Sequence, residues 1–287
     1  MFHHEALLYD GSAGFLSGTL PFIQDGLERG DAVLVAVADE RIELLRDALG
    51  PSDVEFADVT ELGRNPARII PAWTDFLARR GRPARGVGEP VWPGRRGAEL
   101  VETQLHEALL NVAFEHAPDF QLLCPYDSST LDDAVLHEAR CSHPFVNAQP
   151  SRAYRENQLE PFEAPLAPPP AHARVLGFEL DSLADVRRLT AEFAAGLERV
   201  DDLVLAVAEA AANSVRHGGG RGILRIWRTA DAVICDIRDR GHIDDPLAGR
   251  RAPDAEQLGG RGLWIANRVC DLVQVRPGAV RLHMRAN

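Results

Sequence analysis

Prolines divide the chain into two parts. Seven of them stand between residues 144 and 170, with the run APLAPPPA among them. Because proline fixes φ and has no backbone N–H, this stretch cannot form a helix or a central strand, and it predicts an extended, semi-rigid connector. The 287 residues also exceed what one core usually holds. We therefore expect two domains, residues 1–146 and 174–287, joined by a linker at 147–173.

Short apolar runs alternate with amphipathic segments before the connector. Strands are predicted for EALLYD, AVLVAVAD, VEFADV, ARGVGEPVW and FQLLCPYD, and helices for FLSGTLPFIQDGLERG, RIELLRDALG, ARIIPAWTDFLARRG and AELVETQLHEALLNVAFEHA. Alternation of strand and helix is typical of a parallel sheet covered by helices. The first domain is therefore expected to be α/β, with a RecA-like parallel sheet and helices on both faces.

A different pattern follows the connector. Strands are predicted near VLGFEL, ILRIWR, AVICDIRD, LVQV and AVRLHM, and helices from Ser182, from about Asp201 to His217, and from near Gly262. In the last strand Val280, Leu282 and Met284 alternate with polar residues, which predicts a sheet that is wet on one face. We expect an α+β two-layer sandwich, with three helices on one side of a largely antiparallel sheet.

Composition excludes several classes of protein. The formal net charge of -12 repels a phosphate backbone, so direct nucleic-acid binding is not expected. No apolar run approaches the roughly 20 residues of a membrane span, and the N-terminus lacks the features of a secretory signal, which predicts a cytoplasmic protein without a membrane segment. The four cysteines show no CxxC spacing, so we expect free thiols.

Three short motifs in the second half carry chemistry. Glu209, Asn213 and His217 are spaced four apart on a predicted helix and share one face. Asp239 and Gly241 end a predicted strand, where the carboxylate could accept a hydrogen bond from an adenine amino group. Three glycines, Gly259, Gly260 and Gly262, stand before a predicted helix, whose N-terminus favours phosphate binding.

The order and spacing of these motifs resemble the GHKL ATPase superfamily over residues 174–287. The resemblance implies the GHKL or Bergerat ATP-binding fold, with ATP and Mg²⁺ as cofactors. It implies that Asn213 ligates Mg²⁺, that Glu209 is the general base, and that Arg261 contacts the γ-phosphate. Asp239, Gly241 and the three glycines would bind the nucleotide, whereas His217 either borders it or only ends the helix.

Within that superfamily, ExxxNxxxH and the very short lid between Gly241 and Gly259 look like the anti-sigma factor serine kinases. This resemblance implies phosphorylation of a STAS-domain antagonist, sequestration of a sigma factor, and a homodimer. The alternative is an ATP-dependent binding module without catalysis, which would need Asn213 and the glycines but not Glu209. A dimerisation-driven ATPase switch is disfavoured by the short lid, and a histidine kinase by the proline connector, which stands where a phosphoacceptor hairpin is required.

The first domain lacks a phosphate loop, because YDGSAGFLSGT has no Lys before a Ser or Thr. The segments HEALLYDG, GEPVW, LHEALLN and LCPYD resemble the MEDS sensory domain over residues 1–146, which implies an unidentified signal or ligand. Ligands of parallel sheets favour the strand ends, and Glu89 is the strongest candidate for a role there. The pair His106–Glu107 is expected to cap a helix or face solvent. The full set of candidate sensor residues is His4, Tyr9, Glu89, Glu102, His106, Cys124, Tyr126 and His143.

Overall fold

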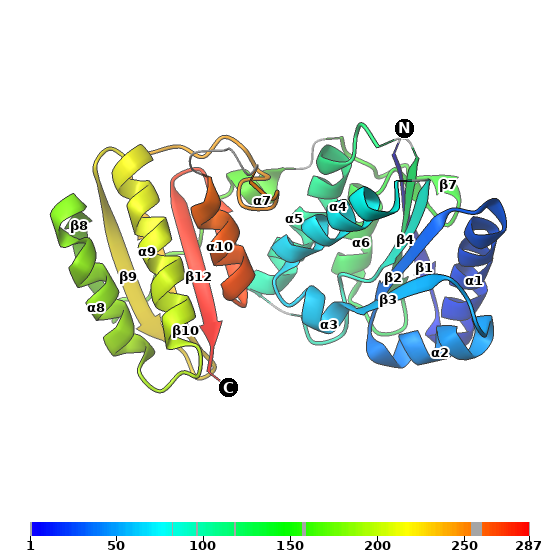
Figure 1. Cartoon of the computed structure of the whole chain (residues 1–287), viewed down its shortest axis with the longest axis horizontal. Helices are drawn as coiled ribbons and strands as arrows, with labels where there is room; N and C mark the ends of the chain where they lie inside the picture. The colour runs from blue at the N-terminus through cyan, green and yellow to red at the C-terminus, as the bar shows by residue number, and fades with distance from the viewer. Residues whose placement is uncertain are drawn as a thin grey trace. The chain divides into compact units, whose positions relative to one another are not determined.

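The computed structural model describes residues 2–81, 83–95, 97–117, 119–156, 159–253 and 260–286, drawn as ribbons in Figure 1. The chain forms two compact units, residues 1–161 and 162–287. None of the helices in the described part of the chain is both long and apolar enough to cross a membrane. The predicted linker 147–173 is not continuous coil, since it contains β7 (Gln149–Pro150) and α7 (Glu160–Glu163).

The first unit is built on a seven-stranded sheet in the order β3-β2-β4-β5-β1-β6-β7. Its pairs are parallel except β6 with β7, which confirms the predicted α/β class. The strands are β1 (His3–Tyr9), β2 (Ala32–Val37), β3 (Val54–Asp58), β4 (Ala84–Gly88), β5 (Phe120–Asp127) and β6 (Phe145–Val146). The helices are α1 (Gly11–Arg29), α2 (Asp39–Leu49), α3 (Val59–Leu62), the 3-10 helix η1 (Pro66–Arg68), α4 (Ile69–Arg80), α5 (Ala98–Ala113) and α6 (Asp133–Ser142).

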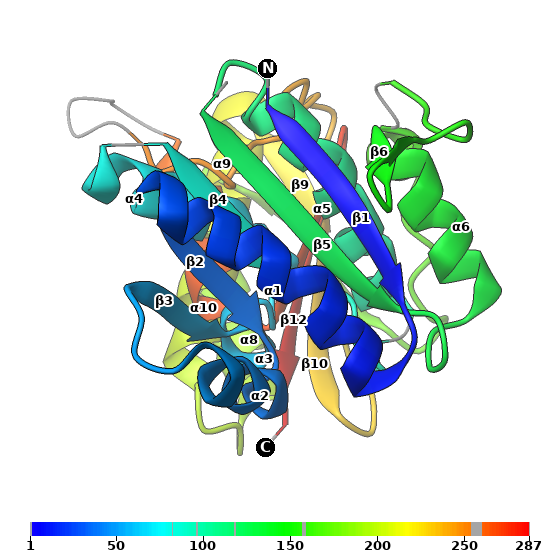
Figure 2. The same ribbon diagram turned by 90° about the vertical axis from the view of Figure 1, so that its right-hand side faces the viewer.

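Helices cover both faces of this sheet, as predicted. Figure 2 shows α1 and α2 on one face and α5 behind the strands. The α1 and α2 side is closed by an apolar cluster that includes Phe15, Ile23 and Leu45. Every residue of β2 is buried, which explains its unbroken apolar run. The strand β4 ends at Gly88 rather than continuing through VW, because Pro90 follows and has no N–H for a ladder.

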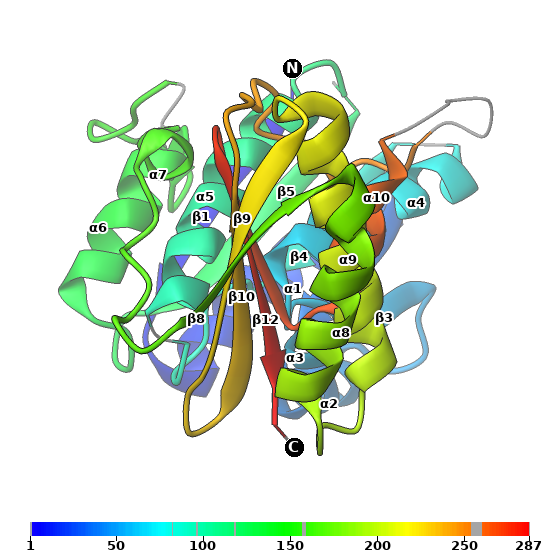
Figure 3. The same cartoon turned by 90° about the vertical axis from the view of Figure 1, so that its left-hand side faces the viewer.

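The second unit is the predicted two-layer sandwich. Its sheet has the order β11-β12-β10-β9-β8 with antiparallel pairs. Three helices lie side by side on one face (Figure 3) and share one core with the sheet. The strands are β8 (Arg174–Glu179), β9 (Arg221–Arg228), β10 (Ala232–Arg238), β11 (Leu272–Arg276) and β12 (Ala279–Arg285). The helices are the 3-10 helix η2 (Leu180–Ser182), α8 (Leu183–Ala194), α9 (Val200–His217) and α10 (Arg261–Val269).

The expected wet face of this sheet is wrong at several positions, because Arg281 and its cross-strand neighbours Asp236 and Gln274 are all buried. Arg281 is only 7% exposed and Asp236 is fully buried. The Arg281 guanidinium donates to Asp236 Oδ2 from Nε at 3.0 Å and from Nη2 at 2.7 Å, and Nη2 also donates to the Ala167 carbonyl at 2.6 Å. Because an ion pair and a carbonyl satisfy the guanidinium, a charged residue can be buried on this face.

Candidate functional site

The helix α9 carries the predicted polar stripe. Its small residues Ala206, Ala210 and Ala211 are buried in the core, so the helix lies close to the sheet. Glu209 and Asn213 are half-buried and His217 is exposed at the end of the helix. Residues four apart share a helix face, and the stripe is therefore directed away from the core.

The turn after β10 is packed tightly against the end of α9. The Gly241 N–H donates to Asp239 Oδ1 at 2.7 Å, which orients that carboxylate. A Cβ added at Gly218 would lie 2.3 Å from Asp239 Cγ, and one added at Gly241 would lie 2.8 Å from the His217 carbonyl oxygen. Both distances are shorter than a van der Waals contact, so this close approach requires glycine.

The first turn of α10 lies against the polar stripe. A Cβ at Gly262 would be 2.9 Å from Asn213 Nδ2 and 3.1 Å from Glu209 Oε2. Gly260 precedes the helix in the left-handed conformation, with φ of 76°. Arg261 is the exposed first residue of α10 and lies beyond the predicted lid. Gly259 lies outside the described residues.

These three elements surround an open cavity of about 800 Å³. Binding pockets for small molecules typically measure about 300–1,000 Å³, so this cavity has the volume of a small-molecule site. Five of the predicted site residues line the cavity: Asn213, His217, Asp239, Gly241 and Gly260. Residues 242–245, 247–249 and 251–253 of the predicted lid also line it. Glu209, Arg261 and Gly262 are not among its described lining residues.

The eight candidate sensor residues do not form one site. In a parallel pair, residues in register project to the same face, and alternate residues along a strand project to opposite faces. His4 pairs with Leu122, Ala6 with Cys124, and Leu8 with Tyr126, so His4, Cys124 and Tyr126 share one face. Tyr9 pairs with Asp127 and lies on the other face.

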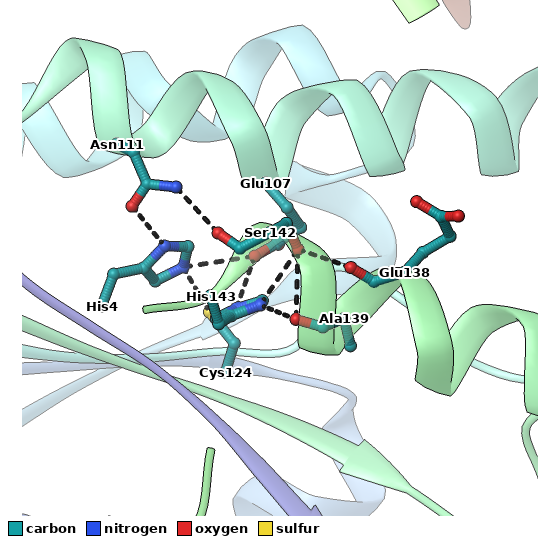
Figure 4. Close-up of polar contacts among 8 residues, drawn as sticks. All are labelled: His4, Glu107, Asn111, Cys124, Glu138, Ala139, Ser142 and His143. Carbon is teal, nitrogen blue, oxygen red and sulfur yellow. Dashed lines mark hydrogen bonds and ion pairs between the residues drawn. The ribbon is translucent and has the colours of Figure 1, made fainter. Parts of the chain in front are cut away.

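On the first face, His4, Cys124 and His143 meet the side chain of Glu107 from α5 (Figure 4). All four side chains are almost completely buried. Glu107 Oε2 lies 2.9 Å from His143 Nε2 and 3.3 Å from His4 Nε2, and Cys124 Sγ lies 3.4 Å from His4 Nε2. The ring of Tyr126 stands edge-on to His143 at 5.6 Å.

Burial perturbs the titration of this cluster. Burial, followed by repulsion from His143, lowers the pKa of His4 to about 4. Burial by itself would raise the pKa of Glu107, but hydrogen bonds with His143 and His4 hold it well below its usual range. Burial also raises the pKa of the Cys124 thiol well above its usual range. Strongly perturbed groups gathered at one point are a signature of functional sites.

On the second face, Glu89 and Tyr9 surround Arg41 of α2. Arg41 forms ion pairs with Glu89 and, at 3.4 Å, with Asp127, and its guanidinium lies 5.1 Å from the centre of the Tyr9 ring. The group lies at the carboxyl ends of the strands. The chain runs from β2 to β3 on one side of this point and from β4 to β5 on the other. Ligands of open parallel sheets usually bind where neighbouring connections diverge in this way. In this chain an ion pair occupies that position.

The remaining two candidates, Glu102 and His106, are buried on α5. The expectation that His106 and Glu107 cap a helix or face solvent is wrong, because the two residues are 1% and 2% exposed. His106 lines a cavity of about 10 Å³ together with Glu89 and Cys124.

Sequence reasoning did not select Glu107, Asn111, Arg41 or Asp127. A signal for the first two was present in the sequence. Glu107 and Asn111 are four apart within an apolar helix, the same spacing that singled out Glu209 and Asn213. Arg41 carried no such signal, because it occurs among charged residues at the start of a helix. Asp127 ends the predicted strand FQLLCPYD, where a ligand was expected, and was not selected.

Comparison with known proteins agrees with both resemblances. The family model of the MEDS domain, the methanogen/methylotroph, DcmR sensory domain, matches residues 3–144, and that of the histidine kinase-like ATPase domain matches residues 177–286. Among curated proteins there is no match. The chain is therefore a sensory domain fused to a kinase-like ATPase domain.

Proposed function

We propose that this fusion of a MEDS domain with a histidine kinase-like ATPase domain is an ATP-dependent regulator of transcription. The C-terminal domain binds Mg-ATP, transfers phosphate to a serine of a STAS-type anti-sigma antagonist, and sequesters a sigma factor. The N-terminal domain controls this activity in response to a signal or small ligand. The protein acts in the cytoplasm as a homodimer, without direct contact to nucleic acid.

The observation that carries the proposal is the convergence of three motifs around one cavity. Asn213, Asp239 and Gly260 come from three separate elements and all line it. Asp239 Oδ1 accepts the Gly241 N–H, which leaves Oδ2 as the acceptor for an adenine amino group. The N-terminus of α10 would place its backbone N–H groups and the positive end of its dipole beside the phosphates.

The residues present also fit a Mg²⁺ ion. Asn213 Nδ2 lies toward Gly262, so the amide oxygen is on the opposite branch of the side chain. Mg²⁺ prefers oxygen ligands, and it keeps several waters and phosphate oxygens in its shell, so one protein ligand suffices. When bound, the ion would neutralise charge on the nucleotide phosphates.

Glu209 is the residue proposed to distinguish catalysis from binding. It would accept the proton of the attacking serine hydroxyl while the serine oxygen bonds to the γ-phosphorus. The bond from that phosphorus to the oxygen bridging to the β-phosphate breaks, and ADP leaves. General-base catalysis is worth roughly 10²- to 10⁴-fold in rate, and most of the remaining acceleration would come from positioning.

The second candidate function is an ATP-dependent binding module that sequesters its partner without catalysis. One observation favours it: Glu209 is not among the residues that line the cavity and lies instead beside Gly262. A pure binder would retain nucleotide affinity when this carboxylate is removed.

The test is transfer of labelled γ-phosphate from Mg-ATP to each STAS-domain protein of the host. We expect one labelled serine with the wild-type chain and none with Asn213→Ala or Glu209→Gln. Nucleotide affinity should fall in Asn213→Ala but stay within about threefold of wild type in Glu209→Gln, because the base contributes little to binding. Arg216→Gln, an exposed position on the same helix, is the matched control. Mg-ATP binding without transfer to any STAS-domain protein would exclude the kinase and leave the binding module.

A further inference from the structure

We propose that the N-terminal domain binds one divalent transition metal ion of the zinc type at His4, Glu107, Cys124 and His143. This site is separate from the nucleotide cavity and goes beyond the proposed kinase activity. The four residues come from β1, α5, β5 and the end of α6, so no short spacing in the sequence reveals them. Figure 4 shows their side chains directed at one point between the sheet and the helices.

The donor atoms have the spacing of a metal shell. One ligand atom from each residue lies within 4.8 Å of all the others. Tetrahedral zinc with bonds of about 2.0–2.3 Å separates neighbouring ligands by about 3.3–3.7 Å. The His4–Glu107 and His4–Cys124 distances of 3.3 and 3.4 Å match this range. The 2.9 Å distance between Glu107 and His143 would open by a few tenths of an ångström.

The Nδ1 atoms of both imidazoles already have hydrogen-bond partners. His143 Nδ1 lies 2.7 Å from the Ala139 carbonyl oxygen, which can only accept, so this nitrogen carries a proton. His4 Nδ1 lies 3.0 Å from Asn111 Oδ1, and the Asn111 amide is oriented by its Nδ2, which donates to the Ser142 carbonyl at 2.8 Å. With the proton on Nδ1, each ring in its neutral form would turn its Nε2 lone pair toward Glu107, where the ion would lie. Metal-binding histidines are oriented by the same kind of hydrogen bond.

Charge balance also calls for a cation. Glu107 is 2% exposed, and within the described residues the basic groups beside its carboxylate are the imidazoles of His4 and His143, which carry no charge when a single proton sits on Nδ1. Its Oε1 has no hydrogen-bond partner among the described residues. A buried carboxylate without compensation is costly. A divalent ion bound to one carboxylate, one thiolate and two neutral imidazoles gives a site with no net charge.

The nature of the donors selects the class of metal. A thiolate and two imidazoles favour zinc and similar transition ions over Mg²⁺ or Ca²⁺, which prefer oxygen ligands. The nearby Ser142 hydroxyl does not compete as a ligand, because its Oγ donates to the Glu138 carbonyl at 3.0 Å. The Asn111 amide contacts Nδ1 of His4 and so orients a ligand. All four ligands are protein groups, and such a closed shell is typical of a structural zinc site.

The test is binding of Co²⁺ to the full chain, purified without a histidine tag and stripped of metal. We expect one Co²⁺ per chain, visible ligand-field bands of a four-coordinate ion, and a near-ultraviolet thiolate-to-cobalt band. Cys124→Ser should abolish the thiolate band, and Glu107→Gln should weaken affinity at least tenfold. Cys141→Ser is the matched control, since Cys141 is a buried thiol of the same unit outside the cluster and should leave the spectrum unchanged.

Two further measurements separate binding from misfolding. Circular dichroism and urea unfolding of the full chain report whether the N-terminal unit of each variant is folded. Zinc analysis of the untreated wild-type chain needs no variant and should find close to one equivalent. A folded wild-type chain that shows no thiolate band with Co²⁺, or a band that persists in Cys124→Ser, would overturn the proposal.

Discussion

At the scale of single residues, Gly218 determines where Asp239 can lie. A methyl group at position 218 would come within 2.3 Å of Asp239 Cγ, and overpacking of this kind costs about 1–3 kcal/mol. We predict that Gly218→Ala weakens Mg-ATP binding at least tenfold, measured by titration calorimetry, because the carboxylate has to move. Gly177→Ala is the control, since a Cβ there meets nothing within 4 Å. Equal nucleotide affinity in the two variants would contradict the prediction.

His283 on β12 makes stability depend on pH. Burial, followed by repulsion from Arg281, lowers its pKa from the usual 6.5 to about 4, although Asp231 and Asp271 act in the opposite direction. Between these two values the unfolded chain binds a proton that the folded chain does not. The contribution of the neutral ring is therefore complete above pH 6.5 and is lost as the pH falls toward 4.

The difference between wild type and His283→Gln isolates this group from the other titrating residues. We predict that, from pH 7 to pH 4, wild type loses about 2–3 kcal/mol more unfolding free energy in urea than the variant does. A glutamine can keep the contact with Gln274, whose Oε1 lies 3.2 Å from His283 Nε2. Parallel stability curves for the two proteins would show that the ring titrates normally in the folded state.

At the scale of elements, the Arg41–Glu89 pair fastens α2 to the end of β4. Glu89 is 2% exposed, so Glu89→Gln leaves the arginine side chain, itself 19% exposed, without its main partner. We predict a loss of about 3 kcal/mol in unfolding free energy, the low end for a broken buried pair, because Asp127 remains within 3.4 Å of Arg41. The double variant Arg41→Met with Glu89→Gln should regain part of this loss.

An exposed pair on the same helix provides the comparison. Arg46 and Glu43 lie 2.7 Å apart, with side chains 54% and 69% exposed. Surface pairs contribute about 0–1 kcal/mol, so Glu43→Gln should change stability little. If Glu89→Gln cost no more than Glu43→Gln, the pair at the strand ends would not stabilise the domain and the space would be available to a ligand.

The elements that carry the motifs of the second unit were predictable, because their patterns are local, whereas α6 (Asp133–Ser142) was not predicted. The small-residue face and polar stripe of α9, and the glycines before α10, follow from spacing along one segment. The cluster around Glu107 was not predictable in this way, because it depends on the register that aligns Ala6 with Cys124. Neighbouring positions on a helix differ by about 100° in direction, so the spacing of Glu107 and Asn111 was the one local indication that Glu107 rather than His106 meets that cluster.

At the scale of the whole molecule, the connector is partly integrated into the second unit. That unit begins at Phe162, 12 residues before β8 starts at Arg174. Two carbonyl groups of the intervening segment accept hydrogen bonds from arginines on the sheet of the second unit. The Ala167 carbonyl accepts from Arg281 at 2.6 Å, and the Leu166 carbonyl accepts from Arg238 at 3.5 Å. Prolines leave these carbonyls available, because a segment without regular structure has no internal partners for them.

We therefore predict that a fragment 162–287 is more stable than a fragment 174–287, although the described residues that line the nucleotide cavity belong to both. Urea unfolding should show a difference of about 1–3 kcal/mol, the cost of leaving a buried donor unpaired. Arg281→Met should reduce the difference, because it removes the donor that the segment satisfies. Mg-ATP affinity should be the same in both fragments. Equal stability of the two lengths would mean that residues 162–173 only connect the two units.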